Sequence, residues 1–295
     1  MRQDIRFRTR DRGFLLGRRT WIMGILNVTP DSFSDGGLLR DAEAAVERGL
    51  ALAADGADII DVGGESTRPG AEPVPAEEEI RRVIPVVDGL RKHSKVLISV
   101  DTTKSQVARR ALDAGADIIN DVSALRFDPD LAGVIAEARA GLVLMNMKGT
   151  PRTMQAAPFY EDLLAEVRGF LESRLREAVS AGIAAESVLL DPGIGFGKRL
   201  EHNLTLINRL DVFADLGRPL VLGTSRKSFI GKILNAPLQE RLEGSIASAV
   251  LGVVRGAHVL RVHDVREVGR AIRVAEAIRD EEPEPDSKGH VRYVS

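Results

Sequence analysis

The sequence contains no cysteine, which excludes disulfide bonds and thiolate metal sites. It also has few aromatic residues, at 4%, and almost no excess of either charge, with a formal net charge of −2. A chain without an overall basic field is a poor match for nucleic acid or for an anionic membrane, so we expect neither as a partner. Any anion must therefore be bound by a local group of residues.

Long hydrophobic runs are missing as well. No apolar run reaches membrane-spanning length, and the arginine-rich start, MRQDIRFRTRDRGF, lacks the apolar centre of a signal peptide. We therefore expect a cytoplasmic protein with no membrane partner. What the chain does have is 44% hydrophobic and 28% charged residues, a balance typical of a globular protein with a sizeable core.

Eight short apolar runs recur along the chain, and each ends abruptly in a polar or glycine-rich cluster. They are rich in Val, Ile and Leu, as strands buried on both faces must be. A helical stretch follows each cluster except at the irregular first turn. Strand, crossover and helix repeated eight times predict a (β/α)8 TIM barrel, which is an α/β fold. The runs are residues 21–26, 58–62, 96–100, 117–119, 142–145, 187–190, 219–222 and 258–262.

The rest of the chain adds little to the barrel, and we expect one domain over residues 1–280. Residues 5–8 and 14–16 flank Asp11, Arg12 and Gly13, which predicts a β-hairpin over 5–16 that could plug the bottom of the barrel. Residues 281–295 are acidic and poor in apolar side chains, so we expect a mobile tail there.

One part of the predicted rim is rich in carboxylates. In such barrels the carboxyl ends of the strands converge on one site. Asp101 ends the third strand, Asn120 and Asp121 end the fourth, and Asp191 ends the sixth. These groups would repel one another or require cations unless the ligand offers several N–H donors, as a guanidine-like heterocycle does. Asp101 alone could instead cap the helix that begins near Lys104.

The opposite part of the rim is basic. Arg261 and His263 alternate at the end of the last strand and so face the same way, opposite Asn27. Residues 225–228, SRKS, lie at a predicted helix start, where free backbone amides favour anions. The loop GGESTRPGAEP adds Arg68, whose planar fork suits phosphate or carboxylate. We interpret this half as a diphosphate clamp, and the two halves together predict a transferase.

Two further loops are less specific. Residues 27–37 form a long, turn-rich segment that is either a mobile lid or an ordinary surface loop. The sixth loop, DPGIGFGKR, lacks the GxxxxGK[ST] spacing of a phosphate loop. Its alternating glycines could instead hold Phe196 over a flat ligand.

Five motifs stand in one order and spacing: NVTPDSFSDGG, GGESTRPG, DPGIGFGK, SRKSFIG and RVHDV. Together they closely resemble the dihydropteroate synthase family over residues 20–278. The resemblance implies a barrel enzyme of folate synthesis that joins 6-hydroxymethyl-7,8-dihydropterin diphosphate to 4-aminobenzoate and releases diphosphate. It also implies Mg2+ as cofactor, two small-molecule substrates and a homodimer.

The same resemblance implies roles for individual residues. The residues that it assigns to pterin and diphosphate are Thr67, Asp101, Asn120, Asp191, Lys227, Arg261 and His263. Those that it assigns to 4-aminobenzoate are Phe33, Thr67, Arg68, Pro69, Phe196 and Ser228. Asn27 would bind the metal, and Asp35 would help to close the first loop. The residues expected to be catalytic are Asp101, Lys227, Arg261 and His263.

The family mechanism implied here is dissociative. Mg2+ and the basic half would stabilise the departing diphosphate, and the arylamine would attack the pterin methylene cation without a general base. Asn146 departs from the family pattern, because many relatives carry His there, and an amide can donate a hydrogen bond but cannot carry charge. Two alternatives stay open: a pterin-dependent methyltransferase with a corrinoid partner, and a pterin-binding module without turnover.

Overall fold

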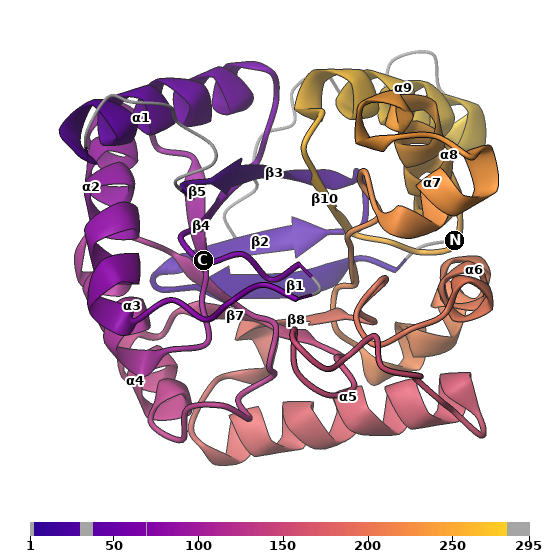
Figure 1. Ribbon diagram of the computed structural model, residues 1–295, viewed down its shortest axis with the longest axis horizontal. Helices are drawn as coiled ribbons and strands as arrows, with labels where there is room; N and C mark the ends of the chain where they lie inside the picture. The colour runs from indigo at the N-terminus through magenta and orange to yellow at the C-terminus, as the bar shows by residue number, and fades with distance from the viewer. Residues whose placement is uncertain (1–2, 30–37, 69, 282–295) are drawn as a thin grey trace.

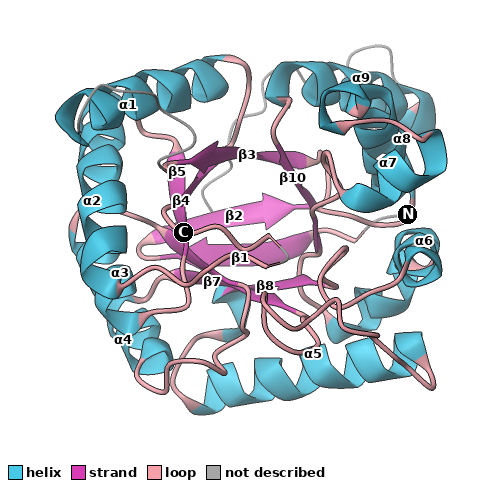
Figure 2. Cartoon of the chain, viewed as in Figure 1, coloured by secondary structure: helices cyan, strands magenta, loops and turns pink. Residues whose placement is uncertain are grey.

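A ring of eight parallel strands forms the centre of the molecule (Figure 1). The structure, a computed structural model, describes residues 3–29, 38–68 and 70–281. The strand order is β8-β7-β6-β5-β4-β3-β10-β9, and a single parallel bridge between Leu190 and Leu220 brings the two ends of the sheet together. Helices surround the ring on the outside (Figure 2). The predicted (β/α)8 barrel is confirmed.

The barrel strands match the eight apolar runs closely. The seventh strand is shorter than expected, because Pro219 has no N–H to donate and only its carbonyl takes part, accepting from Leu190 N at 2.9 Å. The strands are β3 (Trp21–Asn27), β4 (Ile59–Gly63), β5 (Leu97–Asp101), β6 (Ile118–Asp121), β7 (Gly141–Met145), β8 (Val188–Asp191), β9 (Val221–Leu222) and β10 (Val259–Val262).

The helices of the described residues lie between these strands in sequence. They are α1 (Leu38–Ala54), α2 (Ala76–His93), α3 (Ser105–Asp113), α4 (Leu131–Ala138), α5 (Leu163–Ser180), α6 (Leu200–Asn208), α7 (Ser228–Leu234), α8 (Leu242–Val254) and α9 (Val265–Asp280), with 3-10 turns at Ala185–Ser187, Leu210–Leu216 and Leu238–Glu240. None of them is long and apolar enough to cross a membrane. Apart from Glu281, the expected tail lies outside the described residues.

The predicted N-terminal hairpin is present, with a tighter turn than expected. Strands β1 (Ile5–Thr9) and β2 (Arg12–Leu16) pair antiparallel across a turn at Arg10 and Asp11. We had placed Arg12 and Gly13 in the turn, which was wrong. Arg10 takes a left-handed conformation with φ of 52°, so two residues suffice to reverse the chain.

The hairpin closes one end of the barrel, as Figure 1 shows by its position across the ring. Its Phe7, Phe14 and Leu16 are buried in one apolar cluster with Trp21 and with one side chain from every barrel strand. These eight side chains, which we call the lower layer, are Met23, Ile59, Leu97, Ile118, Val143, Leu189, Val221 and Val259. The barrel interior is therefore a packed core at this end and not a channel.

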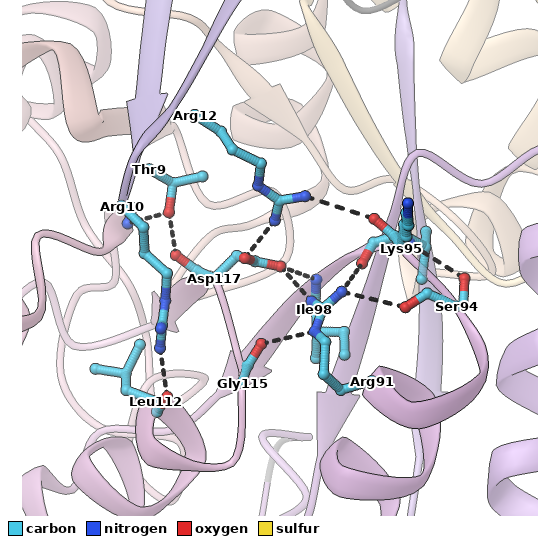
Figure 3. A network of polar contacts seen from close by, with 12 residues as sticks. Thr9, Arg10, Arg12, Arg91, Ser94, Lys95, Ile98, Leu112, Gly115 and Asp117 are labelled. Atoms are coloured by element: carbon cyan, nitrogen blue, oxygen red, sulfur yellow. Dashed lines mark hydrogen bonds and ion pairs between the residues drawn. The ribbon is translucent and has the colours of Figure 1, made fainter.

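Polar contacts at Asp117 fasten the hairpin to this end (Figure 3). The Asp117 carboxylate pairs with Arg12 of β2 and, at 2.6 Å, with Arg91 of α2, and it also accepts from Ile98 N at 2.9 Å. The Thr9 hydroxyl donates to the Asp117 carbonyl. One carboxylate thus joins the hairpin, a helix and the β5 strand.

Replacing Phe7 with Ala should remove a fully buried ring from the apolar cluster that the hairpin forms with the lower layer. We expect the free energy of unfolding to fall by about 3–5 kcal/mol, the usual cost of deleting a buried phenylalanine ring. Urea denaturation measures the change. Arg8→Ala, on the exposed face of the same strand, should change it by less than about 0.5 kcal/mol. Similar losses in both variants would mean that the hairpin does not plug the barrel.

Candidate active site

The barrel interior changes from apolar to polar at the level above the lower layer. Because side chains alternate along a strand, the residue two positions after each member of the lower layer faces the interior again. These second-level positions, the upper layer, are Ile25, Asp61, Ser99, Asn120, Met145, Asp191, Gly223 and Arg261. Asn27, Gly63, Asp101 and His263 follow at the rim. The strands thus bring most of the predicted polar residues to one end of the barrel.

Arg261 is at the centre of the carboxylate group. Its Nε donates to Asp61 Oδ2 at 2.6 Å and its Nη2 to Asp101 Oδ2 at 2.8 Å. The same Asp61 oxygen accepts from Asn120 Nδ2 at 3.1 Å. The two carboxylates raise the pKa of the Arg261 guanidinium against the opposing effect of burial, so this cation is permanent.

Asp61 is a residue that the sequence analysis missed. It is fully buried in the middle of β4, where we had seen only an apolar run. A charged residue inside a strand buried on both faces was the available signal, because such a group must have a partner or a function. Its Oδ1 atom has no hydrogen-bond partner in the described structure, and neither has the hydroxyl of Ser99, which stands opposite Asp61 on β5. Two buried polar atoms are thus left unsatisfied at this level of the barrel.

Asp101 belongs to the barrel interior and does not cap a helix. The N-cap of α3 is Lys104, and Ser105 N donates to Asp128 at 2.7 Å. The alternative interpretation of Asp101 was therefore wrong. Burial, together with the negative charge of Asp61, raises the pKa of Asp101 to about 7 in spite of Arg261. Its charge is therefore sensitive to small changes around it.

Asp121 does not share the site with Asn120, contrary to our expectation. Its two oxygens accept from Ser123 N at 2.7 Å and from Leu125 N at 2.5 Å, so the carboxylate closes the turn that follows β6. The reason is strand alternation: Asn120 faces the interior, and the next residue must face away from it. Three interior carboxylates remain, with Asp61 in place of Asp121.

Asp191 and Lys227 lie on the next part of the rim. Asp191 accepts from Gly193 N at 2.7 Å, and burial raises its pKa, opposed mainly by the charge of Lys227. Lys227, the N-cap of α7, donates to the Ile194 carbonyl. Burial lowers the pKa of Lys227 to about 8. An ammonium has three N–H donors, so two of them can serve a ligand.

Phe196 lies on the loop after β8, as expected for a wall of the site. Its ring packs against a small cluster of Val122, Met145, Met147 and Met154, and Lys227 Nζ lies 4.9 Å from the ring centroid. The glycines on either side have φ of 84° and 63°, a conformation that other residues rarely adopt. This explains why glycines alternate in the loop and how it can present one aromatic side chain.

The basic part of the rim is smaller than predicted. His263 Nδ1 lies 3.1 Å from Ser225 Oγ, and burial, followed by the charge of Arg261, lowers the pKa of His263 to about 4. The ring is therefore neutral at pH 7. Arg226, which the sequence places among the anion-binding groups, is instead paired with Asp264 through its Nε and Nη2 atoms. Ser228 is exposed in the first turn of α7.

Only part of the first two loops is described. Thr67 is half-buried and Arg68 exposed, after a segment held by the Glu65–Lys104 ion pair and by Arg82, which donates to Gly64 O at 2.9 Å. Asn27 lies at the end of β3 next to Gly63. The predicted site residues Phe33, Asp35 and Pro69 lie outside the described residues.

Asn146 has a partner that the sequence did not reveal. Its side-chain oxygen accepts from Lys198 Nζ at 2.8 Å, and both residues are buried. We had considered Asn146 as a donor, whereas here its side-chain oxygen is an acceptor. Lys198 was not among our candidate residues.

The described side chains can be tested for their fit to the expected Mg2+. No group of three or more acidic or histidine side chains in the described parts of the chain could hold a cation by itself. Magnesium commonly takes one or two protein oxygens, with phosphate and water for the rest. A single amide oxygen at Asn27 fits an ion that is held mainly by a diphosphate.

Comparison with known proteins agrees with this geometry. The Escherichia coli dihydropteroate synthase is 51% identical over 256 residues, 87% of this chain and 90% of that protein. The Xanthomonas albilineans enzyme with 4-aminobenzoic acid superposes with a TM-score of 0.87 at 46% identity, over 94% of this chain and 99% of that one. Its complex with 7,8-dihydropteroate superposes with a TM-score of 0.82 at 44% identity, over 92% and 99% of the two chains.

The chain also matches a sequence pattern that describes a whole family. The sequence pattern of the pterin binding enzymes matches residues 23–263, from the first barrel strand to the histidine after the last. This range contains the lower layer, the upper layer and the rim. The chain therefore belongs to the pterin binding enzyme family.

Proposed function

We propose that the chain catalyses the dihydropteroate synthase reaction, in which a dihydropterin diphosphate and 4-aminobenzoate give 7,8-dihydropteroate and diphosphate. The observation that carries the proposal is the polar group in which Arg261 is held between Asp61 and Asp101, beside Asn120. Such a group offers acceptors for the N–H donors of a pterin and a flat cation to stack on it. The dihydropteroate synthases that this chain resembles support the same reaction.

The pterin would bind deep in the barrel. Asp191 accepts from the ring amino group and the adjacent N–H, while Lys227 donates to ring acceptors with the N–H groups that the Ile194 carbonyl does not use. Asp101 and Asn120 complete the polar edge. Asp101, Asn120 and Asp191 stand on strand ends, so they should keep their positions without a ligand.

The diphosphate would lie at the rim, between Arg261, His263 and Asn27. With its pKa near 4, His263 is a neutral hydrogen-bond donor at pH 7, and Arg261 supplies the positive charge. Mg2+ bound to Asn27 and the diphosphate would neutralise charge on the leaving group. Charge stabilisation here favours departure of diphosphate, which leaves a methylene cation for the arylamine.

The arylamine would enter from the loops. Phe196 lies on the loop after β8, Ser228 in the first turn of α7, and Thr67 and Arg68 on the loop after β4. Arg68 suits the carboxylate of 4-aminobenzoate because its guanidinium is exposed. Phe33 and Pro69, which lie outside the described residues, remain predicted members of this pocket. An aniline nitrogen needs no base at neutral pH, so no proton acceptor is required among these residues.

Turnover tests the proposal directly. Wild-type protein with the pterin diphosphate, Mg2+ and 4-aminobenzoate should form dihydropteroate, detected by mass, and release diphosphate. Asp191→Asn should bind pterin at least about ten-fold more weakly in calorimetry, because an amide opposes a donor to the ring N–H groups and charged hydrogen bonds contribute about 1.5–3 kcal/mol each.

Asp130→Asn, at an exposed carboxylate that precedes α4, is the matched control and should behave as wild type. Pterin binding without diphosphate release would favour the module without turnover. Methyl transfer to a corrinoid protein would favour the methyltransferase. Pterin affinity of Asp191→Asn within three-fold of wild type would remove Asp191 from the site.

The pH dependence of turnover should report on Asp101. Because its pKa is about 7, kcat/KM should fall as the pH is lowered through 7 and the carboxylate becomes protonated. Asp61→Asn removes a neighbouring negative charge that raises this pKa, so the acidic limb should move to lower pH. The maximum should also fall, because Arg261 loses one partner. An acidic limb that stays in place would show that another group titrates.

We also propose that the protein is a homodimer formed through α7, α8 and α9. Six large apolar side chains are between 50% and 73% exposed on these neighbouring helices, which cluster together in Figure 1. Large exposed apolar side chains on neighbouring helices favour an association surface there. We call them the α7–α9 surface, and they are Ile233, Leu234, Leu251, Val254, Val274 and Ile278.

Charged substitutions on the α7–α9 surface should separate the two subunits. We expect Leu251→Glu combined with Ile278→Glu to sediment as a monomer where wild type sediments as a dimer, because burying two carboxylates in an apolar interface is costly. Val179→Glu, at a 45% exposed apolar position on α5, should not alter sedimentation. A double variant that stays dimeric would place the interface elsewhere.

Other expectations remain predictions. They are the cytoplasmic location, the absence of nucleic-acid and membrane partners, and the extent of a single domain over residues 1–280. The last is favoured by the hairpin and the barrel strands, which share one apolar cluster.

A further inference from the structure

Lys198 is a buried lysine to which the proposed reaction gives no role. It follows the DPGIGFG segment, and only 3% of its surface is exposed. Its Nζ donates to Asn146 Oδ1 at 2.8 Å, to Phe196 O at 3.0 Å and to Asn146 O at 3.3 Å. An ammonium has three N–H donors, and here each has an acceptor. All three acceptors are neutral, so no carboxylate compensates the charge directly.

These contacts join the end of β7 to the loop after β8. The two backbones touch, since Asn146 N donates to Asp191 O at 2.9 Å, and a Cβ at Gly193 would lie 1.8 Å from Asn146 O. Further along, a Cβ at Gly197 would lie 2.6 Å from Lys148 O. Lys198 therefore holds the loop at the Phe196 carbonyl, directly beside the side chain that faces the site.

The charged and titratable surroundings of Lys198 come from five segments of the chain. Asp191 on β8 favours the ammonium, while Lys227 at the start of α7 and Lys148 after β7 oppose it. The Tyr160 ring lies 5.9 Å from Nζ, and its hydroxyl donates to Gly197 O at 3.1 Å. Burial lowers the pKa of His202 on α6, and the charge of Lys198 adds to this effect. Burial dominates and lowers the pKa of Lys198 to about 7.

We propose that Lys198, held by Asn146, is a positioning residue for the arylamine, because its ammonium fixes the Phe196 wall of the pocket. The inference rests on the proposed function. A neutral amine has two N–H donors and a lone pair that no facing carbonyl can use. One of the three contacts is therefore lost when the proton leaves, and the loop loosens. Arylamine affinity should decline as the pH rises through 7, while pterin affinity depends on residues that Lys198 does not hold and should change less.

Asn146 provides the critical variant. Asn146→Asp places a carboxylate against Lys198 Nζ, and an opposite charge at this distance stabilises the ammonium and raises its pKa. The alkaline rise in KM for 4-aminobenzoate should then move upward by at least about one pH unit. Lys198→Met should raise this KM about ten-fold at pH 6.5, the size of one lost charged hydrogen bond, and should remove its pH dependence. The KM for the pterin diphosphate should change by less than about three-fold.

Two further measurements separate this inference from the proposed function. Carbon-13 NMR of the lysine Cε, assigned by its loss in Lys198→Met, follows the protonation of Lys198 whether or not the protein turns over. Calorimetry of 4-aminobenzoate with Mg2+, diphosphate and a pterin present measures the pocket without chemistry. Lys232→Met, an exposed lysine on α7, is the matched control and should match wild type in both.

The outcomes are distinct. A wild-type protein that binds 4-aminobenzoate in this pH-dependent way without forming dihydropteroate would overturn the proposed reaction and support the positioning role. The inference is overturned if Asn146→Asp leaves both the Cε titration and the pH dependence of affinity unchanged. It is also overturned if a folded Lys198→Met protein binds 4-aminobenzoate as wild type does. If Lys198→Met does not fold, Asn146→Asp decides alone.

Discussion

The ion pairs of Arg261 with Asp61 and Asp101 are the interaction on which the upper half of the barrel depends. Two carboxylates on the adjacent strands β4 and β5 would repel each other in a buried site, and burial already raises the pKa of Asp101. A guanidinium on β10, two strands away from β4, reaches both of them. Removing one partner from such a group leaves an uncompensated buried charge, which usually costs several kcal/mol. The geometry of this end of the barrel therefore depends on all three side chains.

The lower layer makes this arrangement possible. One apolar side chain from each strand, together with Phe7, Phe14 and Leu16 of the hairpin, forms a packed core directly beneath the charged residues. Hydrophobic burial at that level can offset groups above it that are imperfectly satisfied, such as Asp61 Oδ1 and Ser99 Oγ. On each strand, the apolar residue of the core therefore lies two positions before the residue of the upper layer. The Asp117 contacts then fasten the hairpin that closes the core.

The rim is held in a different way from the strands. The loops after β7 and β8 approach until their backbones touch, which only glycine permits at Gly193 and Gly197. Glycines have no side chains that could pack together at this contact. Hydrogen bonds from Lys198 hold the two loops together instead. Rigid strand ends therefore carry the pterin side of the proposed site, while the arylamine side relies on a few polar contacts between loops. The second kind of support is more sensitive to pH and to substitution.

The sequence by itself determined the barrel, because eight Val-, Ile- and Leu-rich runs separated by helical spacing have few other ways to bury both faces. It also placed Asp101, Asn120, Asp191 and Arg261 at strand ends, where alternation and parallel strands bring them together. Whether a given side chain was free for a ligand could be decided only by the tertiary structure. Arg226 is paired with Asp264, Asp121 closes a turn, and Asp61 faces the interior from within an apolar run. Each of these outcomes depends on partners distant in sequence or on a turn that spacing does not specify, because charge compensation is set by neighbours in space.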